Sequence, residues 1–105
     1  MDDSFANNVT AIAGGGQSLI SNVTATVTRI GTVATTGDSL TLQKASGGLR
    51  YKIINKGANS ANIFPLLGDQ INALGVNTAF ALAATKSVEF ISTGSGQWDT
   101  FPITP

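Results

Sequence analysis

The sequence predicts an all-β fold, a jelly-roll-like β-sandwich of about eight short antiparallel strands behind an extended N-terminal arm. Three observations predict it. Segments rich in β-branched residues alternate apolar and polar side chains, as in residues 23–30. Glycine-containing turns separate such segments at short intervals. No helix N-cap precedes a long 3.6-residue repeat, so the alanine-rich residues 79–84 are also expected to form a strand.

The 105 residues are predicted to form one domain with an extension at each end. Residues 1–21 are polar and contain Gly14-Gly15-Gly16, so we expect an arm that is flexible or exchanged with a neighbouring copy. Residues 22–101 are expected to form the sandwich. Two prolines predict an extended C-terminal tail over residues 102–105.

Turn chemistry predicts where the first strands pair. Gly37 and Asp38 suit a two-residue hairpin loop between residues 32–36 and 39–43, and this register separates an apolar face from a polar one. The agreement of turn chemistry with the hydrophobic pattern favours this hairpin.

A second hairpin is predicted from residues 49–56 and 61–66, and a third around the loop 94–96, which leads into residues 97–101. The second strand pair carries apolar residues on both faces. Its second face is therefore expected to be covered either by this chain's own other sheet or by a neighbouring subunit.

Charge is scarce along the whole chain. Charged residues make up 11%, against about 25% in average proteins, and the formal net charge is zero. A surface of hydroxyl and amide groups costs little to desolvate, which favours repeated subunit contacts, although an ordinary neutral domain has the same composition. Arg50, Lys52 and Lys56 share one side of a predicted strand and suit a solvated rim better than a phosphate site, so no nucleic-acid partner is expected.

The residue types of catalytic and metal sites are few. The chain contains no histidine and no cysteine, which removes thiol chemistry and the usual ligands of zinc, copper and haem. The internal carboxylates suit turns and strand surfaces, and a calcium site at Asp69 and Asn72 would need further oxygen ligands. We therefore expect no catalytic residues, no cofactor and no metal. The four internal carboxylates are Asp38, Asp69, Glu89 and Asp99.

The sequence also argues against a membrane partner. No apolar run approaches the roughly 18 residues that a membrane span requires. The N-terminus, which carries Asp2 and Asp3, does not resemble a signal peptide, so synthesis in a cytoplasm is expected.

One long run of the chain has a recognisable pattern. Residues 51–65, 68–72 and 77–82, followed by a glycine-rich turn and Gln97-Trp98, resemble small tailed-phage virion proteins, most closely capsid decoration (cement) proteins. The same pattern occurs in phage tail-fibre segments. The resemblance implies a jelly-roll-like homotrimer on the capsid exterior, bound to the major capsid protein and made in the host cytoplasm.

Seven apolar side chains are the candidate assembly contacts, taken from the arm, from the second face of the central strand pair and from the last strand. An alternative function is a tail-fibre or spike module in which Trp98 stacks on a host glycan, and another is a cellular interaction module without a virus connection. Against the glycan role, Trp98 also suits a core or interface anchor. The seven candidates are Phe5, Val9, Ile12, Ile54, Ile63, Trp98 and Phe101.

Overall fold

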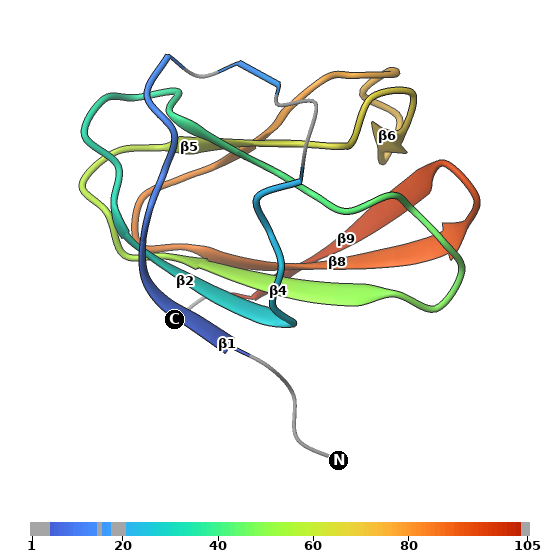
Figure 1. Ribbon diagram of the computed structural model, residues 1–105, viewed down its shortest axis with the longest axis horizontal. Coiled ribbons are helices and arrows are strands. Elements are labelled where there is room, and N and C mark those ends of the chain that lie inside the picture. Colours follow the sequence, from blue (N-terminus) through green and yellow to red (C-terminus); the bar gives the residue numbers. More distant parts are fainter. Residues whose placement is uncertain (1–4, 15, 18–20, 104–105) are drawn as a thin grey trace.

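The computed structural model describes residues 5–14, 16–17 and 21–103. These residues form nine β-strands in two layered sheets, and none of them is helical (Figure 1). The all-β prediction is therefore confirmed. The strand order, in contrast, is that of a solenoid-like coil and does not confirm a jelly roll.

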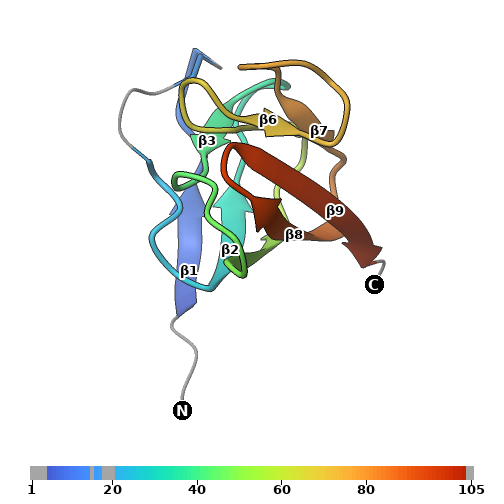
Figure 2. The ribbon, with the colours of Figure 1, turned by 90° about the vertical axis from the view of Figure 1, so that its right-hand side faces the viewer.

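The larger sheet has six strands in the order β1-β2-β4-β8-β9-β6, and the smaller has three in the order β3-β5-β7. Figure 2 shows β3 and β7 in one layer, with β1, β2 and β8 in the layer below. The strands are β1 (Phe5–Thr10), β2 (Val27–Thr32), β3 (Ser39–Thr41), β4 (Arg50–Asn55), β5 (Ala61–Phe64), β6 (Gln70–Ile71), β7 (Phe80–Leu82), β8 (Ser87–Gly94) and β9 (Gln97–Ile103).

The first half of the chain winds as a coil. Strands β1, β2 and β4 lie side by side and parallel in the large sheet, while β3 and β5 are parallel in the small one. The chain crosses from one sheet to the other between β2 and β3 and again between β4 and β5. The expectation of an antiparallel sandwich is therefore wrong for this half.

The second half runs back along the coil. β7 is antiparallel to β5, and β8 is antiparallel to β4. β9 then folds back on β8 through a tight turn, which pairs Ser92 with Trp98. This is the third predicted hairpin, and it is confirmed, as is the strand expected within residues 79–84.

The other two predicted hairpins are wrong. A turn does form at Gly37, where the Asp38 N–H donates to the Thr35 carbonyl at 3.0 Å. However, β3 pairs with β5 rather than with residues 32–36, and β4 pairs with β2 and β8 rather than with β5. Both turns redirect the chain between sheets, because the apolar residues that follow each turn bury equally well against the opposite layer.

A buried asparagine holds the crossing from β4 to β5. Asn55 has no exposed surface. Its Nδ2 donates to the carbonyl oxygens of Asn59 and Leu82, each at 3.0 Å, and its Oδ1 accepts from the Gly57 N–H at 2.9 Å. Buried amides need such partners, and here they are all backbone groups of two adjacent crossings. One side chain thus fixes the path of the chain at both crossings.

Successive crossings stack closely on one another. Asn59 Nδ2 donates to the Val33 carbonyl at 2.8 Å, and the Lys56 N–H donates to the Ile30 carbonyl at 2.9 Å. A Cβ at Gly57 would lie 2.7 Å from the backbone nitrogen of Val33. Only glycine permits this approach of two backbone segments.

The core fills the space between the sheets. Trp98 and Phe90 are its largest side chains, the Phe90 ring meets Phe80 edge to face with centroids 5.6 Å apart, and Tyr51 lies 5.7 Å from Trp98. Such pairs add to the free energy gained from burial. The other large fully buried apolar residues are Val23, Ile30, Leu40, Leu42, Ile53, Ile63, Ile71 and Val88.

Both predicted extensions contribute to the fold within the described residues. Phe5–Thr10, expected in the arm, form the edge strand β1, and Ala11 is buried in the core. Strand β9 continues to Ile103, so part of the expected C-terminal tail pairs with β8.

We predict that Gly57→Ala lowers the free energy of unfolding by about 1–3 kcal/mol, because the new methyl group overlaps the backbone of Val33. Urea unfolding followed by circular dichroism measures the change. Gly47→Ala is the matched control, since a Cβ at Gly47 meets no atom within 4 Å. Equal stability of the two variants would contradict the close stacking of the crossings.

Candidate interaction surface

One face of the six-stranded sheet points away from the core. Side chains alternate along a strand, so in β8 Val88 and Phe90 point inward while Glu89 and Ile91 point outward. The register carries this alternation across neighbouring strands and aligns Val27, Lys52, Glu89 and Phe101 in one row. We define the outer sheet face by the outward residues Phe5, Val27, Arg29, Arg50, Lys52, Ile54, Glu89, Ile91, Asp99 and Phe101.

Two phenylalanines on the outer sheet face are strongly exposed. Phe5 is 76% exposed and is aligned with Val27 at one end of the row, and Phe101 is 55% exposed at the other end. Between them Ile54 and Ile91 are half-buried. Aromatic side chains left in water are the residues that gain most from burial against a partner.

The charges on this face are of both signs. Arg50 Nε lies 3.4 Å from Glu89 Oε2, and Thr93 Oγ1 donates to Asp99 Oδ2 at 2.8 Å. Lys52 is next to Glu89 in the same row. An exposed pair of this kind adds little stability. Because acidic groups stand among the cations, the face suits a protein surface better than a phosphate backbone.

The structure brings three of the seven predicted contact residues together, since Phe5, Ile54 and Phe101 all lie on the outer sheet face. Ile12 is 49% exposed at the crossing that follows β1, and Val9 packs against the core. Ile63 and Trp98 are fully buried in the chain's own core. These last two therefore stabilise the fold and offer no surface to a partner.

Sequence reasoning missed Val27 and Ile91 on the same face. The alternation of β8 carried a signal for Ile91, because Ile91 falls in phase with the outward Glu89. Nothing local indicated that Val27 would be aligned with Lys52, since that neighbourhood requires parallel pairing of β2 with β4.

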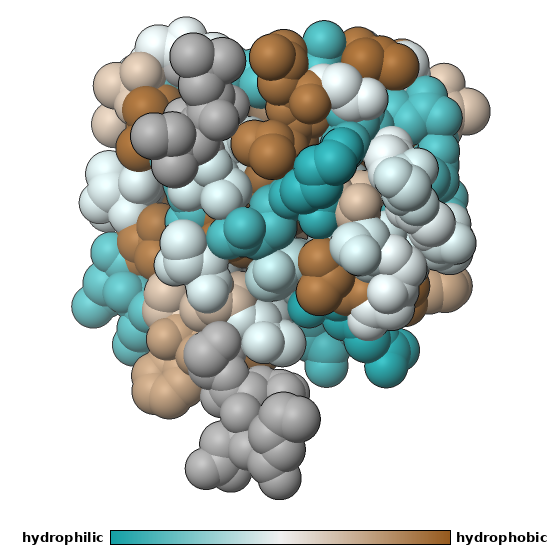
Figure 3. Space-filling view, turned by 45° about the vertical axis from the view of Figure 1, so that its right-hand side comes forward, coloured by the Kyte–Doolittle hydropathy of each residue, from teal (hydrophilic) through white to brown (hydrophobic). Residues whose placement is uncertain are grey.

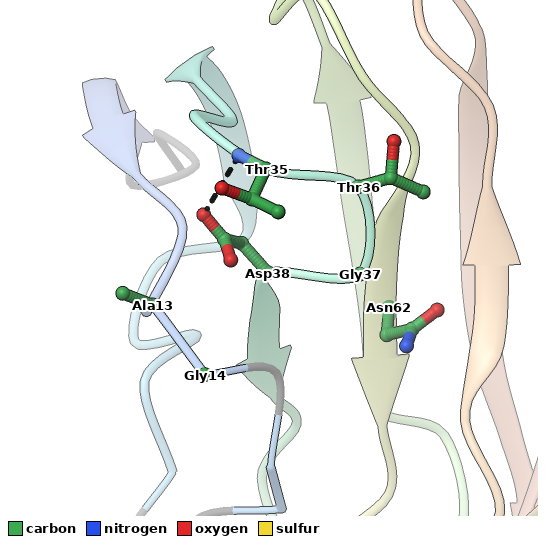
Figure 4. Close-up of a pocket in the computed structure, with 7 residues that line it drawn as sticks. All are labelled: Ala13, Gly14, Thr35, Thr36, Gly37, Asp38 and Asn62. Carbon is green, nitrogen blue, oxygen red and sulfur yellow. Dashed lines mark hydrogen bonds between the residues drawn. The ribbon is translucent and has the colours of Figure 1, made fainter.

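A polar pocket of about 390 Å³ lies between the segment that follows β1 and the crossing from β2 to β3. It is lined by Ala13, Gly14, Thr35, Thr36, Gly37, Asp38 and Asn62. Figure 4 shows Asp38 turned toward the backbone of Thr35, whose N–H donates to Asp38 Oδ2 at 3.2 Å. No aromatic ring lines this pocket, so it offers hydrogen bonds to a small polar ligand but no platform for stacking.

Asp69 has a structural role that the sequence did not reveal. Its carboxylate is fully buried, accepts the Ala45 N–H at 2.8 Å and lies 3.1 Å from Lys44 Nζ. The expectation of a loop carboxylate is therefore incomplete, because Asp69 links two loops through the interior. Within the described residues, no three acidic side chains gather as they would around a metal ion.

No protein-family model, curated protein or solved structure matches this chain. The described residues include no helix long and apolar enough to cross a membrane.

We predict that Trp98→Ala lowers the free energy of unfolding by about 3–5 kcal/mol, because it removes the largest side chain of the core and leaves a cavity. Denaturation followed by circular dichroism is the appropriate measurement, since the variant has no tryptophan left to report. Phe101→Ala, an exposed position on the same strand, serves as the control and should change stability little. A small effect of Trp98→Ala would place the indole at the surface and revive its proposed stacking on a glycan.

A second prediction concerns Tyr51. Partial burial raises the pKa of its hydroxyl above the ordinary value of 10.0. The folded state therefore favours the neutral phenol, and this contribution to stability is present below the unfolded pKa and is lost as pH rises through the folded value. Because Tyr51 is the only tyrosine, ultraviolet titration reports it directly. A midpoint at or below that of the urea-unfolded chain would contradict the burial.

Proposed function

We propose that this chain is a non-enzymatic structural protein of a phage virion, which binds the outer surface of the capsid as a homotrimer and stabilises it. The observation that carries the proposal is the outer sheet face. Phe5 and Phe101 are exposed there at opposite ends of a row whose other residues are apolar or charged. The resemblance of residues 51–98 to capsid decoration proteins supports the same function.

The surface also carries apolar groups outside the row of Phe5 and Phe101. Figure 3 shows small hydrophobic patches separated by polar residues on one side of the molecule. Charged residues make up only 11% of the chain, but five of the ten residues that define the outer sheet face are charged, so a partner that covers this face must offer groups that pair with both signs. A capsid repeats its binding sites many times, so a modest gain per site is multiplied by avidity when a trimer binds.

The alternative, a tail-fibre or spike module for host glycans, loses its aromatic contact, because Trp98 is fully buried. It retains the polar pocket beside Asp38 and Asn62 as a source of hydrogen bonds. Sugar recognition commonly adds stacking to such bonds, and no ring lines this pocket, so we favour capsid binding.

The test adds purified protein to capsids that lack it and measures occupancy by co-sedimentation. Wild-type protein should saturate at a regular number of copies per capsid. Phe101→Ser should weaken binding by about tenfold or more, because burying a phenylalanine contributes about 1.5–3 kcal/mol.

Leu67→Ser is the matched control, because Leu67 is 56% exposed, as Phe101 is, but lies in the loop before β6 and away from the outer sheet face. Its occupancy should equal that of the wild type. Equal loss in both variants, or no binding of wild-type protein, would overturn the proposal; binding of wild-type protein to glycan instead would favour the alternative.

A further inference from the structure

The ends of the two sheets differ in how their backbone groups are covered. A strand at a sheet edge presents unpaired N–H and C=O groups, and proteins protect such edges with bulges, prolines or covering segments. In the described part of the chain the two sheets end at β1, at β6 with β9, at β3 and at β7. The first three of these edges are each protected in one of these ways.

Strand β1 is irregular. Asn8 has a positive φ of 55°, and the register with β2 shifts on both sides of Val9. Strand β3 is covered by other segments, since Ile12 and Ser39 exchange backbone hydrogen bonds of 2.8 and 3.0 Å, and Asn22 Oδ1 accepts the Thr41 N–H at 2.9 Å. Neither strand offers a regular row of free groups.

The edge at β9 is closed by a side chain and a proline. Asn72 Oδ1 accepts the Thr100 N–H at 3.2 Å, and the Asn72 N–H donates to the Trp98 carbonyl at 2.7 Å. The next residue facing this side is Pro102, which has no N–H to donate. Val76 forms a bridge with Gln70 on β6.

Strand β7 lacks these protections. The Leu82 carbonyl faces inward, where it accepts from Asn55 Nδ2 at 3.0 Å. Alternate residues of an antiparallel strand face opposite sides, so the backbone of Ala81 faces outward. Within the described residues no strand pairs with that side, and the short length of β7 is its one safeguard.

An apolar cleft of about 200 Å³ runs along this strand. It is formed by β7, by the crossing that follows and by the start of β8, with Phe80, Leu82 and Val88 as its large apolar residues. Lys86 also lines it, and Lys56 is exposed on the adjoining crossing, where the Asn55 N–H donates to the Lys86 carbonyl at 2.9 Å. An added strand would meet backbone groups, an apolar cleft and positive charge.

The chain itself contains a segment of complementary charge. Of its six acidic residues, Asp38 and Asp69 are buried, and Glu89 and Asp99 are engaged on the outer sheet face. The other two are adjacent, within Met1-Asp2-Asp3-Ser4, outside the described residues and directly before β1.

We infer that residues 1–4 of one copy add as a strand to β7 of a second copy, with their carboxylates at Lys86. Within one copy, the segment would have to span the width of the large sheet before it could reach β7 in the other sheet. Phe5 is three strand positions from Glu89 on β8, which is about 14 Å at the usual strand spacing. Four extended residues reach about 13–14 Å, and they would still have to pass around the sheet to lie along β7.

The contact is heterologous, because the segment and the cleft are different surfaces. Repeated from copy to copy, such a contact closes into a ring if the rotation permits, and a trimer is one such ring. This inference rests on the self-assembly in the proposed function but does not depend on capsid binding.

The first experiment measures the mass of the full chain in solution by light scattering over a range of concentrations. Lys86→Glu alone, and Asp2→Lys with Asp3→Lys, should each weaken association by about tenfold or more, because like charges then meet. Combining all three substitutions should restore it. Lys52→Glu, an exposed lysine on the outer sheet face, is the control and should leave association unchanged.

A disulfide test locates the contact, since the chain has no native cysteine. A chain with Ser4→Cys and Ala83→Cys should form cross-linked oligomers on oxidation, and a chain with Ser4→Cys and the exposed Gly47→Cys should not. A wild-type monomer at all concentrations, a disulfide within one copy, or equal cross-linking of both variants would overturn the inference. An oligomer with these properties that ignores capsids would overturn only the proposed function.

Discussion

The fold depends on satisfying one buried amide at the point where the chain leaves the large sheet. Asn55 has no contact with solvent, and its side chain bonds to backbone groups of its own crossing and of Leu82, the last residue of β7 before the chain crosses to β8. A buried polar group left without partners costs more than its bonds contribute when they form. The two crossings must therefore lie together, and the outgoing strands β4 and β5 are held beside the returning strands β8 and β7.

The outer sheet face follows from that constraint. Because the Gly57 backbone contacts Val33, the second turn of the coil sits directly on the first, and β2 and β4 are parallel and in register. Parallel pairing aligns outward residues from distant parts of the sequence. The hairpin β8–β9 pairs with β4 and continues these rows of outward residues across the sheet. The result places Phe5 and Phe101 at opposite ends of one surface.

The same physics explains what could be predicted. Alternation along residues 87–94 and the tight turn at 94–96 are local, so β8, β9 and the burial of Phe90 could be derived from the sequence. The turns at Gly37 and at residues 57–60 were recognised, but turn chemistry does not say whether the next strand returns to its neighbour or crosses to the opposite sheet. Both outcomes bury Leu40 and Ile63. For this reason Phe5, Ile54 and Phe101 could be named as candidates from the sequence, while their grouping on one face could not.

The sheet edges bear on the self-association inferred above. A coil of parallel strands exposes long edges, and pairing at any of them would yield aggregates of no fixed geometry. The irregular β1, the covered β3 and Pro102 on β9 each close one route. Among the described strands, β7, which is short and lies beside an apolar cleft, is the edge left for an added strand. With these three edges closed, the strand addition inferred at β7 would join copies to one another without covering the surface proposed to bind the capsid.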